Sequence, residues 1–96
     1  MKIPKSIKFN GIIYPVKEVE RLNGEQQWGQ TTFKVPSISL ERDLHPLVKE
    51  KVFIHELLHI AFLATGLDWD NKKEETAIHA WENSIYGILK ENNLLK

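Results

Sequence analysis

The residues with the clearest capacity for chemistry form the run His55-Glu56-Leu57-Leu58-His59, an H-E-x-x-H motif. If this run is helical, its two histidines lie four residues apart on one face, so both imidazoles can reach one metal ion. Zinc binds neutral imidazole nitrogens and takes four ligands in a tetrahedron. With three protein ligands, the fourth position stays open for a water molecule that Glu56 can deprotonate. The motif therefore predicts a zinc-dependent hydrolase with His55 and His59 as ligands and Glu56 as general base.

Helical spacing surrounds this motif. Steps of three and four residues predict a helix over residues 45–65, which starts near His45 and is followed by Gly66 as a suitable C-cap. A second helix is predicted over residues 72–93. Six apolar residues are expected to form its buried face: Ala77, Ile78, Trp81, Ile85, Ile88 and Leu89.

The residues before the first helix are typical of strands. Residues 1–41 contain alternating and β-branched apolar residues, and Asn10-Gly11 is a strong signal for a type I′ hairpin turn. Further strands are predicted over residues 31–35 and 37–40, and Gly29 indicates a loop. We therefore expect one α+β domain over residues 1–96, a small antiparallel sheet followed by a helical hairpin.

The third metal ligand is expected from the segment after the motif helix. The residues of suitable type there are Asp68, Asp70, Glu74, Glu75 and His79. Glu74 lies nearer the centre of the apolar face of the second helix, and Glu75 lies at its border. Acidic residues are also favourable at any helix N-terminus, because they face the positive end of the helix dipole. The residue pattern alone leaves Glu74 and Glu75 open.

Composition excludes several classes of protein. The 96 residues carry 13 basic and 13 acidic side chains, so a formal net charge of zero argues against a nucleic-acid binder and a polybasic membrane-surface protein. The absence of cysteine rules out disulfides, an iron–sulfur cluster and a cysteine nucleophile. No apolar run has the length of a signal peptide or a membrane span, so we expect a cytoplasmic protein.

Three segments resemble a known family. The motif His55–His59, the following F-L-A-T-G-L at residues 62–67 and the run 75–92 are similar to small phage- and prophage-encoded zinc peptidases. These are zincin-like proteins, distantly similar to ImmA/IrrE-type metallopeptidases. The resemblance covers residues 37–94 and implies that Glu75 is the third zinc ligand. It departs from the family pattern at Glu82, where a small residue is usual, and at His79, where an acidic residue is common.

The resemblance also implies where a substrate would bind. In zincins an edge strand before the motif helix pairs with an extended substrate peptide, and Ile38-Ser39-Leu40 occupies that place in the sequence. Tyr86 or His79 would contact the substrate or stabilise an oxyanion. The predicted function is a Zn²⁺-dependent peptidase that acts on a peptide or protein in the cytoplasm of a bacterial host. One alternative is a zincin-fold module that binds zinc without catalysis, and another is an interaction protein of a mobile element that binds no metal. The sequence says nothing of oligomeric state.

Overall fold

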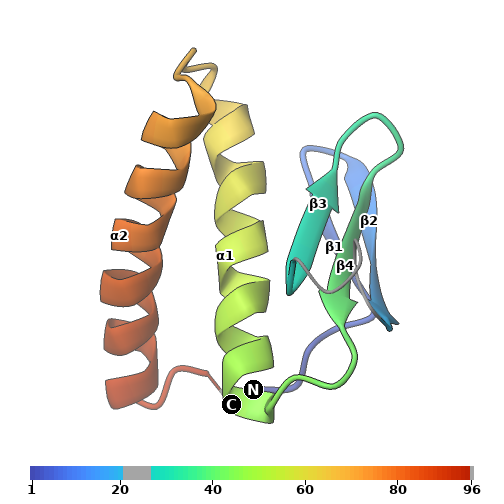
Figure 1. Cartoon of the computed structure of the whole chain (residues 1–96), viewed down its shortest axis with the longest axis vertical. Helices are drawn as coiled ribbons and strands as arrows, with labels where there is room; N and C mark the ends of the chain where they lie inside the picture. Colours follow the sequence, from blue (N-terminus) through green and yellow to red (C-terminus); the bar gives the residue numbers. More distant parts are fainter. Residues whose placement is uncertain (21–26, 96) are drawn as a thin grey trace.

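A mixed sheet and two antiparallel helices make up the described part of the chain. The computed structural model describes residues 1–20 and 27–95. The strands are β1 (Ser6–Phe9), β2 (Ile12–Val19), β3 (Gly29–Thr32) and β4 (Ser37–Glu41), followed by the helices α1 (Pro46–Thr65) and α2 (Asn71–Glu91). Helix α1 lies between α2 and the sheet (Figure 1). The predicted α+β class is confirmed.

The order of the strands is β1-β2-β4-β3, and it differs from the expected antiparallel sheet. The β1–β2 hairpin is antiparallel and turns at Asn10 and Gly11, which both have the positive φ of the predicted turn. Strand β4, however, pairs in parallel with β2, with Val16 opposite Ile38, and antiparallel with β3. The expectation of a purely antiparallel sheet is therefore wrong, because the chain crosses over between β2 and β4.

One face of this sheet packs against α1. Apolar side chains of β2 and β4 point to this face and meet two apolar residues of the helix, and together they form the buried cluster of Tyr14, Ile38, Leu40, Phe53 and Ile60. Ile38 and Leu40 both reach this cluster because residues two apart in a strand project to the same side of the sheet. The core therefore fixes the rotation of α1, and with it the direction in which the H-E-x-x-H motif faces.

Both helices begin and end at residues that satisfy the free backbone groups. The Nδ1 of His45 accepts a hydrogen bond from the backbone N–H of Leu47, and Gly66 ends α1 in the left-handed conformation. The Asp70 side chain accepts from the backbone N–H of Lys73 at 2.8 Å and so caps α2. Within the described ranges, neither helix is long and apolar enough to cross a membrane.

The buried face of α2 is not the apolar stripe that the sequence suggested. Ile78 is fully buried, but Trp81, Ile85 and Ile88 are 38%, 39% and 60% exposed. Helix α2 packs against α1 with the stripe that carries Glu82 and Ile78, its two buried side chains. The expectation that the six-residue apolar face forms the core is therefore wrong for these three residues. The contacts of Glu74 and Glu82 with histidines of α1 hold α2 in this orientation about its axis.

Candidate metal centre

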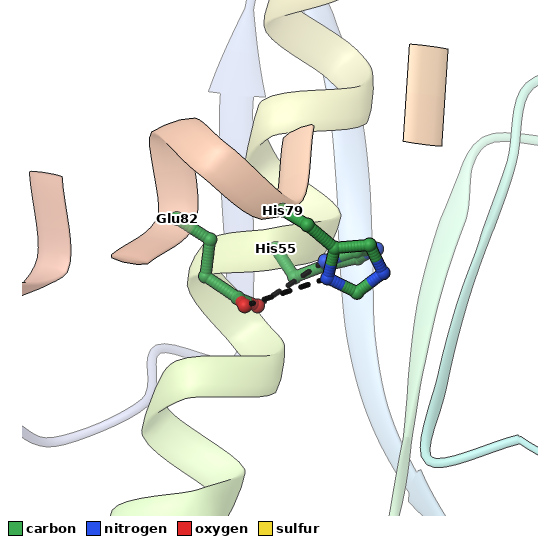
Figure 2. A group of neighbouring side chains, drawn as sticks. All are labelled: His55, His79 and Glu82. Carbon is green, nitrogen blue, oxygen red and sulfur yellow. Dashed lines mark hydrogen bonds and ion pairs between the residues drawn. The ribbon is translucent and has the colours of Figure 1, made fainter. Parts of the chain in front are cut away.

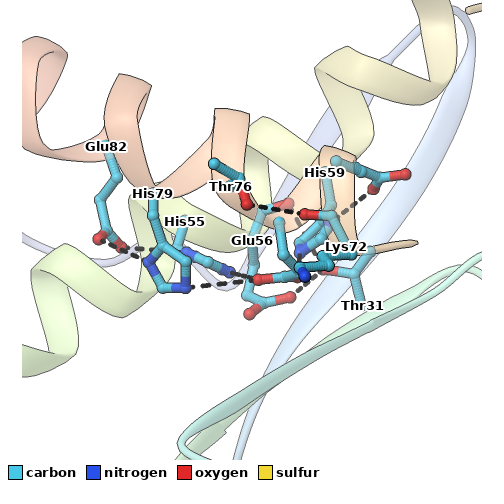
Figure 3. Close-up of polar contacts among 10 residues, drawn as sticks. Thr31, His55, Glu56, His59, Lys72, Thr76, His79 and Glu82 are labelled. Carbon is cyan, nitrogen blue, oxygen red and sulfur yellow. Dashed lines mark hydrogen bonds and ion pairs between the residues drawn. The ribbon is translucent and has the colours of Figure 1, made fainter. Parts of the chain in front are cut away.

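Three histidines converge on one carboxylate between the two helices. The Nε2 of His59 lies 2.7 Å from Oε1 of Glu75, and the Nε2 of His55 lies 3.4 Å from Oε2 of the same side chain. The Nε2 of His79, one helical turn after Glu75, lies 3.5 Å from that Oε2. Figure 3 labels the three histidines, two from α1 and one from α2. The structure thus brings together both motif histidines, Glu75 and His79.

The other nitrogen of each motif histidine faces a second carboxylate. The Nδ1 of His59 lies 2.7 Å from Oε2 of Glu74, and the Nδ1 of His55 lies 3.2 Å from Oε1 of Glu82. A carboxylate can accept a proton from Nδ1, and in that tautomer Nε2 is the nitrogen that can bind a cation. Carboxylates in this position orient metal-binding histidines in many proteins. The geometry therefore distinguishes the two glutamates that the residue pattern left open: Glu75 faces Nε2 of both motif histidines, whereas Glu74 faces Nδ1 of His59.

The donor set fits a zinc ion. Ligands at roughly 2.0–2.1 Å in a tetrahedron lie about 3.3 Å from one another, close to the 3.4 Å between His55 Nε2 and Glu75 Oε2. Nitrogen and carboxylate oxygen are the ligand types of catalytic zinc sites. The Nε2 of His59 lies closer, 2.7 Å from Glu75 Oε1, so this pair would separate by about 0.6 Å to share an ion. His59 also has a carboxylate at each ring nitrogen, and a bound cation would offset this negative charge.

Glu56 lies beside this group and is held by the sheet. Its side chain is buried, and the Thr31 hydroxyl donates to Oε1 at 2.7 Å. Burial raises the pKa of the Glu56 carboxyl above its usual range, while the Thr31 hydrogen bond and the nearby imidazoles oppose the rise. A raised pKa makes a carboxylate a stronger base, which suits proton transfer near neutral pH.

Gly29 allows β3 to approach this carboxylate. A Cβ added at Gly29 would lie 2.6 Å from Cγ1 of Val52 and 3.0 Å from Oε2 of Glu56. Gly29 was expected in a loop but is the first residue of β3. The strand predicted over residues 31–35 corresponds to β3, which ends at Thr32. A side chain at this position would require Val52, Glu56 or β3 itself to shift, so the close contact between strand and helix depends on the glycine.

The first testable consequence concerns this glycine. We expect Gly29→Ala to lower the free energy of unfolding by about 1–3 kcal/mol, the usual cost of overpacking. Gly87 in α2 is a matched control, because a Cβ there meets nothing within 4 Å. Gly87→Ala should raise stability by up to about 1 kcal/mol through helix propensity. Urea unfolding of both variants checks this, and equal effects would contradict the close approach at Gly29.

A cleft of about 990 Å³ opens over the candidate site. Its walls include β3 and the first turns of α1, with Trp28, Gln30, Thr31, Leu47, Val48 and Lys51. The strand along the cleft is β3, the last strand in the sheet order. The prediction that Ile38-Ser39-Leu40 is an edge strand is wrong, because β4 pairs on both sides and buries Ile38 and Leu40 completely.

Tyr86 lines the same cleft, but its hydroxyl is engaged elsewhere. It donates to Oε1 of Glu50 at 2.9 Å, and burial together with this contact raises the pKa of the phenol. Glu50 is itself buried and also accepts from Lys90 and from the α-ammonium group of Met1. Of the two residues named for substrate or oxyanion contact, His79 is the one that contacts Glu75.

The buried Glu50 predicts sensitivity to acid. Burial alone would raise the pKa of this carboxyl, but hydrogen bonds from Met1, Lys90 and Tyr86 overcome that effect and hold the pKa at about 2. A depressed pKa stabilises the fold above the ordinary value of 4.5, and this stability is lost as pH falls from about 4.5 to 2. We expect Glu50→Gln to cost about 2 kcal/mol at pH 7 and to lose this difference in acid. Urea unfolding at pH 7 and pH 2.5 measures it, and a constant difference would contradict the assignment.

Three site residues were not identified as such from the sequence. Glu82 stood out as a departure from the family pattern, Gly29 as a loop signal and Thr31 as part of a predicted strand. The spacing of Glu82, seven residues after Glu75 and thus on the same helix face, was the available signal. The remaining ligand candidates lie apart from the site, with Asp68 exposed and Asp70 serving as the cap of α2.

Comparison of this chain with protein-family models, curated proteins and solved structures finds no match.

Proposed function

We propose that this protein is a zinc-dependent peptidase whose metal is held by His55, His59 and Glu75. The observation that carries the proposal is the arrangement of the two motif histidines, with Nε2 toward Glu75 and Nδ1 toward Glu74 and Glu82. Holding both rings in this orientation brings the carboxylates of Glu74, Glu75 and Glu82 together in a partly buried place. This arrangement costs free energy unless a cation offsets the negative charge. The resemblance of the H-E-x-x-H segment to small phage- and prophage-encoded zinc peptidases supports the same proposal.

The residues around the ligands supply the rest of a hydrolytic mechanism. A zinc ion at this position would supply Lewis acidity, which acidifies a water molecule and polarises a carbonyl group. Glu56 accepts the proton from the attacking water and passes it to the amine that leaves when the peptide bond breaks. The Thr31 hydroxyl keeps the Glu56 carboxyl directed into the cleft during both transfers.

Substrate binding is proposed along β3. An edge strand has free backbone N–H and C=O groups that can pair with an extended peptide. Because β3 lines the cleft next to Glu56, a peptide added there would place a backbone carbonyl near the ligand group. In this proposal β3, and not β4, is the strand that binds the substrate. The protein would then contact mainly the backbone of a peptide or protein substrate.

The test combines metal content with cleavage. Protein purified without chelators or a His-tag should contain about one zinc ion per chain, measured by plasma mass spectrometry. Incubation with a diverse peptide mixture should yield products that disappear on addition of a chelator and return with zinc. Protein with zinc but no cleavage would favour the alternative, a zinc-binding module without catalysis. Protein that takes up no zinc would exclude both.

A further inference from the structure

His79 is placed in the same way as the two motif histidines. Its Nε2 lies 3.5 Å from Glu75 Oε2, the same oxygen that His55 Nε2 approaches at 3.4 Å. Its Nδ1 faces Oε2 of Glu82, at 3.9 Å, while the other oxygen of Glu82 contacts His55 (Figure 2). Glu82 therefore faces the Nδ1 atoms of both rings, whose centroids are 4.9 Å apart.

From this parallel placement we propose that His79 is a fourth protein ligand of the metal centre in the substrate-free protein. The proposal rests on the metal site of the proposed function and adds a residue to it. The separation of 3.5 Å from a ligand oxygen is close to the spacing of about 3.3 Å between neighbouring ligands of tetrahedral zinc. His55, His59, Glu75 and His79 then supply the four donors that zinc prefers.

A second group of donors in the described residues competes with this assignment. His55, His79 and Glu82 also place one ligand atom each within 4.8 Å of one another, as do His55, His59 and Glu75. The two groups share His55, so filling both would require both of its ring nitrogens to bind metal, with loss of the Nδ1 proton that Glu82 accepts. Each group has three donors, but the Nε2 group contains both motif histidines, and His79 approaches its Glu75 oxygen at 3.5 Å, so we place one ion on the Nε2 side.

A fourth protein ligand has a consequence for access. Four protein ligands close a zinc site, whereas a catalytic site needs a position for water or substrate. His79 is 63% exposed, compared with 13% for His55 and 17% for His59. Its contact with Glu82 is longer than a hydrogen bond, so His79 is the ligand that can leave at the lowest cost. The resting protein would be closed, and water or substrate would enter the coordination sphere as His79 departs.

Cadmium-113 bound to ¹⁵N-labelled protein tests the assignment directly by NMR. We expect nitrogen–cadmium coupling at Nε2 of three histidines, His55, His59 and His79, and none at His45, which caps α1 outside the site. Coupling at His55 and His59 alone would overturn the proposal and leave the proposed metal centre intact. Coupling through Nδ1 of His55 and His79 would place the ion in the competing group and would also overturn it. Absence of coupling at every histidine would refute both the proposal and the metal centre.

Zinc affinity gives an independent measurement. His79→Ala should weaken zinc binding at least about 10-fold in competition with a chromogenic chelator. His45→Asn is the matched control, because asparagine keeps a side-chain acceptor at the helix cap and leaves the site unchanged. Equal affinity of wild type and His79→Ala would overturn the role of His79, and the wild-type affinity reports separately on the metal centre.

Discussion

Replacement of Glu75 by alanine is expected to abolish stoichiometric zinc binding, whereas replacement of Glu74 only weakens it. Glu75 faces the Nε2 atoms of both motif histidines, so its loss removes a ligand. Glu74 contacts only Nδ1 of His59 among the site histidines described, so its loss leaves the ligands in place but frees one ring to rotate. Loss of an orienting partner typically costs about 10–100-fold in metal affinity.

Zinc content and chelator competition of both variants measure this difference. Glu91→Ala is the control, since Glu91 is an exposed glutamate at the end of the same helix. Zinc retained at wild-type affinity by the Glu75 variant would contradict its role as a ligand. Equal loss in the Glu74 and Glu75 variants would show that the two carboxylates cannot be divided into ligand and orienting residue.

Substitution of Glu56 by glutamine should stop peptide cleavage while zinc remains bound. Glutamine has the same shape and keeps an acceptor for the Thr31 hydroxyl, so the packing beside Gly29 is retained. It cannot accept a proton from the attacking water. General base catalysis contributes typically about 10²–10⁴-fold, and we expect the rate to fall by at least this factor.

The measurement compares initial rates of zinc-loaded wild type and Glu56→Gln on a peptide cleaved by the wild type. Zinc content and the midpoint of thermal unfolding serve as internal controls for an intact site. Cleavage at the wild-type rate by the loaded variant would exclude Glu56 as the base. A variant that has lost zinc would show that the glutamate has a structural part in the site as well.

The parts of this fold that follow from short-range pattern were predictable from the sequence. Asn10-Gly11 determines its turn through local conformation, and the predicted helices over residues 45–65 and 72–93 match α1 and α2 to within two residues, with Gly66 after the end of α1. The proximity of His55 and His59 likewise needs only the geometry of one helix. Each of these features depends only on residues that are close together in the sequence, so it can be predicted from the sequence alone.

The remaining features depend on how distant segments meet. The place of β4 between β2 and β3 is set by a crossover that no local signal records. The need for glycine at position 29 arises only because Val52 and Glu56 come close in space. Likewise, the inward face of α2 follows from the partners that Glu74 and Glu82 find on α1, which outweigh the apolar spacing of Trp81, Ile85 and Ile88.

The division of the site between two helices bears on how long a metal ion would stay bound. Helix α1 is fixed against both the sheet and α2, whereas the buried side chains of α2 are Ile78 and Glu82 alone among its described residues. Local opening of α2 would remove Glu74, Glu75, His79 and Glu82 in one event and leave two histidines, which hold zinc weakly. The residence time of the ion would then be governed by the opening rate of α2 rather than by the strength of any single bond. Conversely, a bound ion would fasten α2 to α1 and act as the cross-link that this small apolar interface lacks.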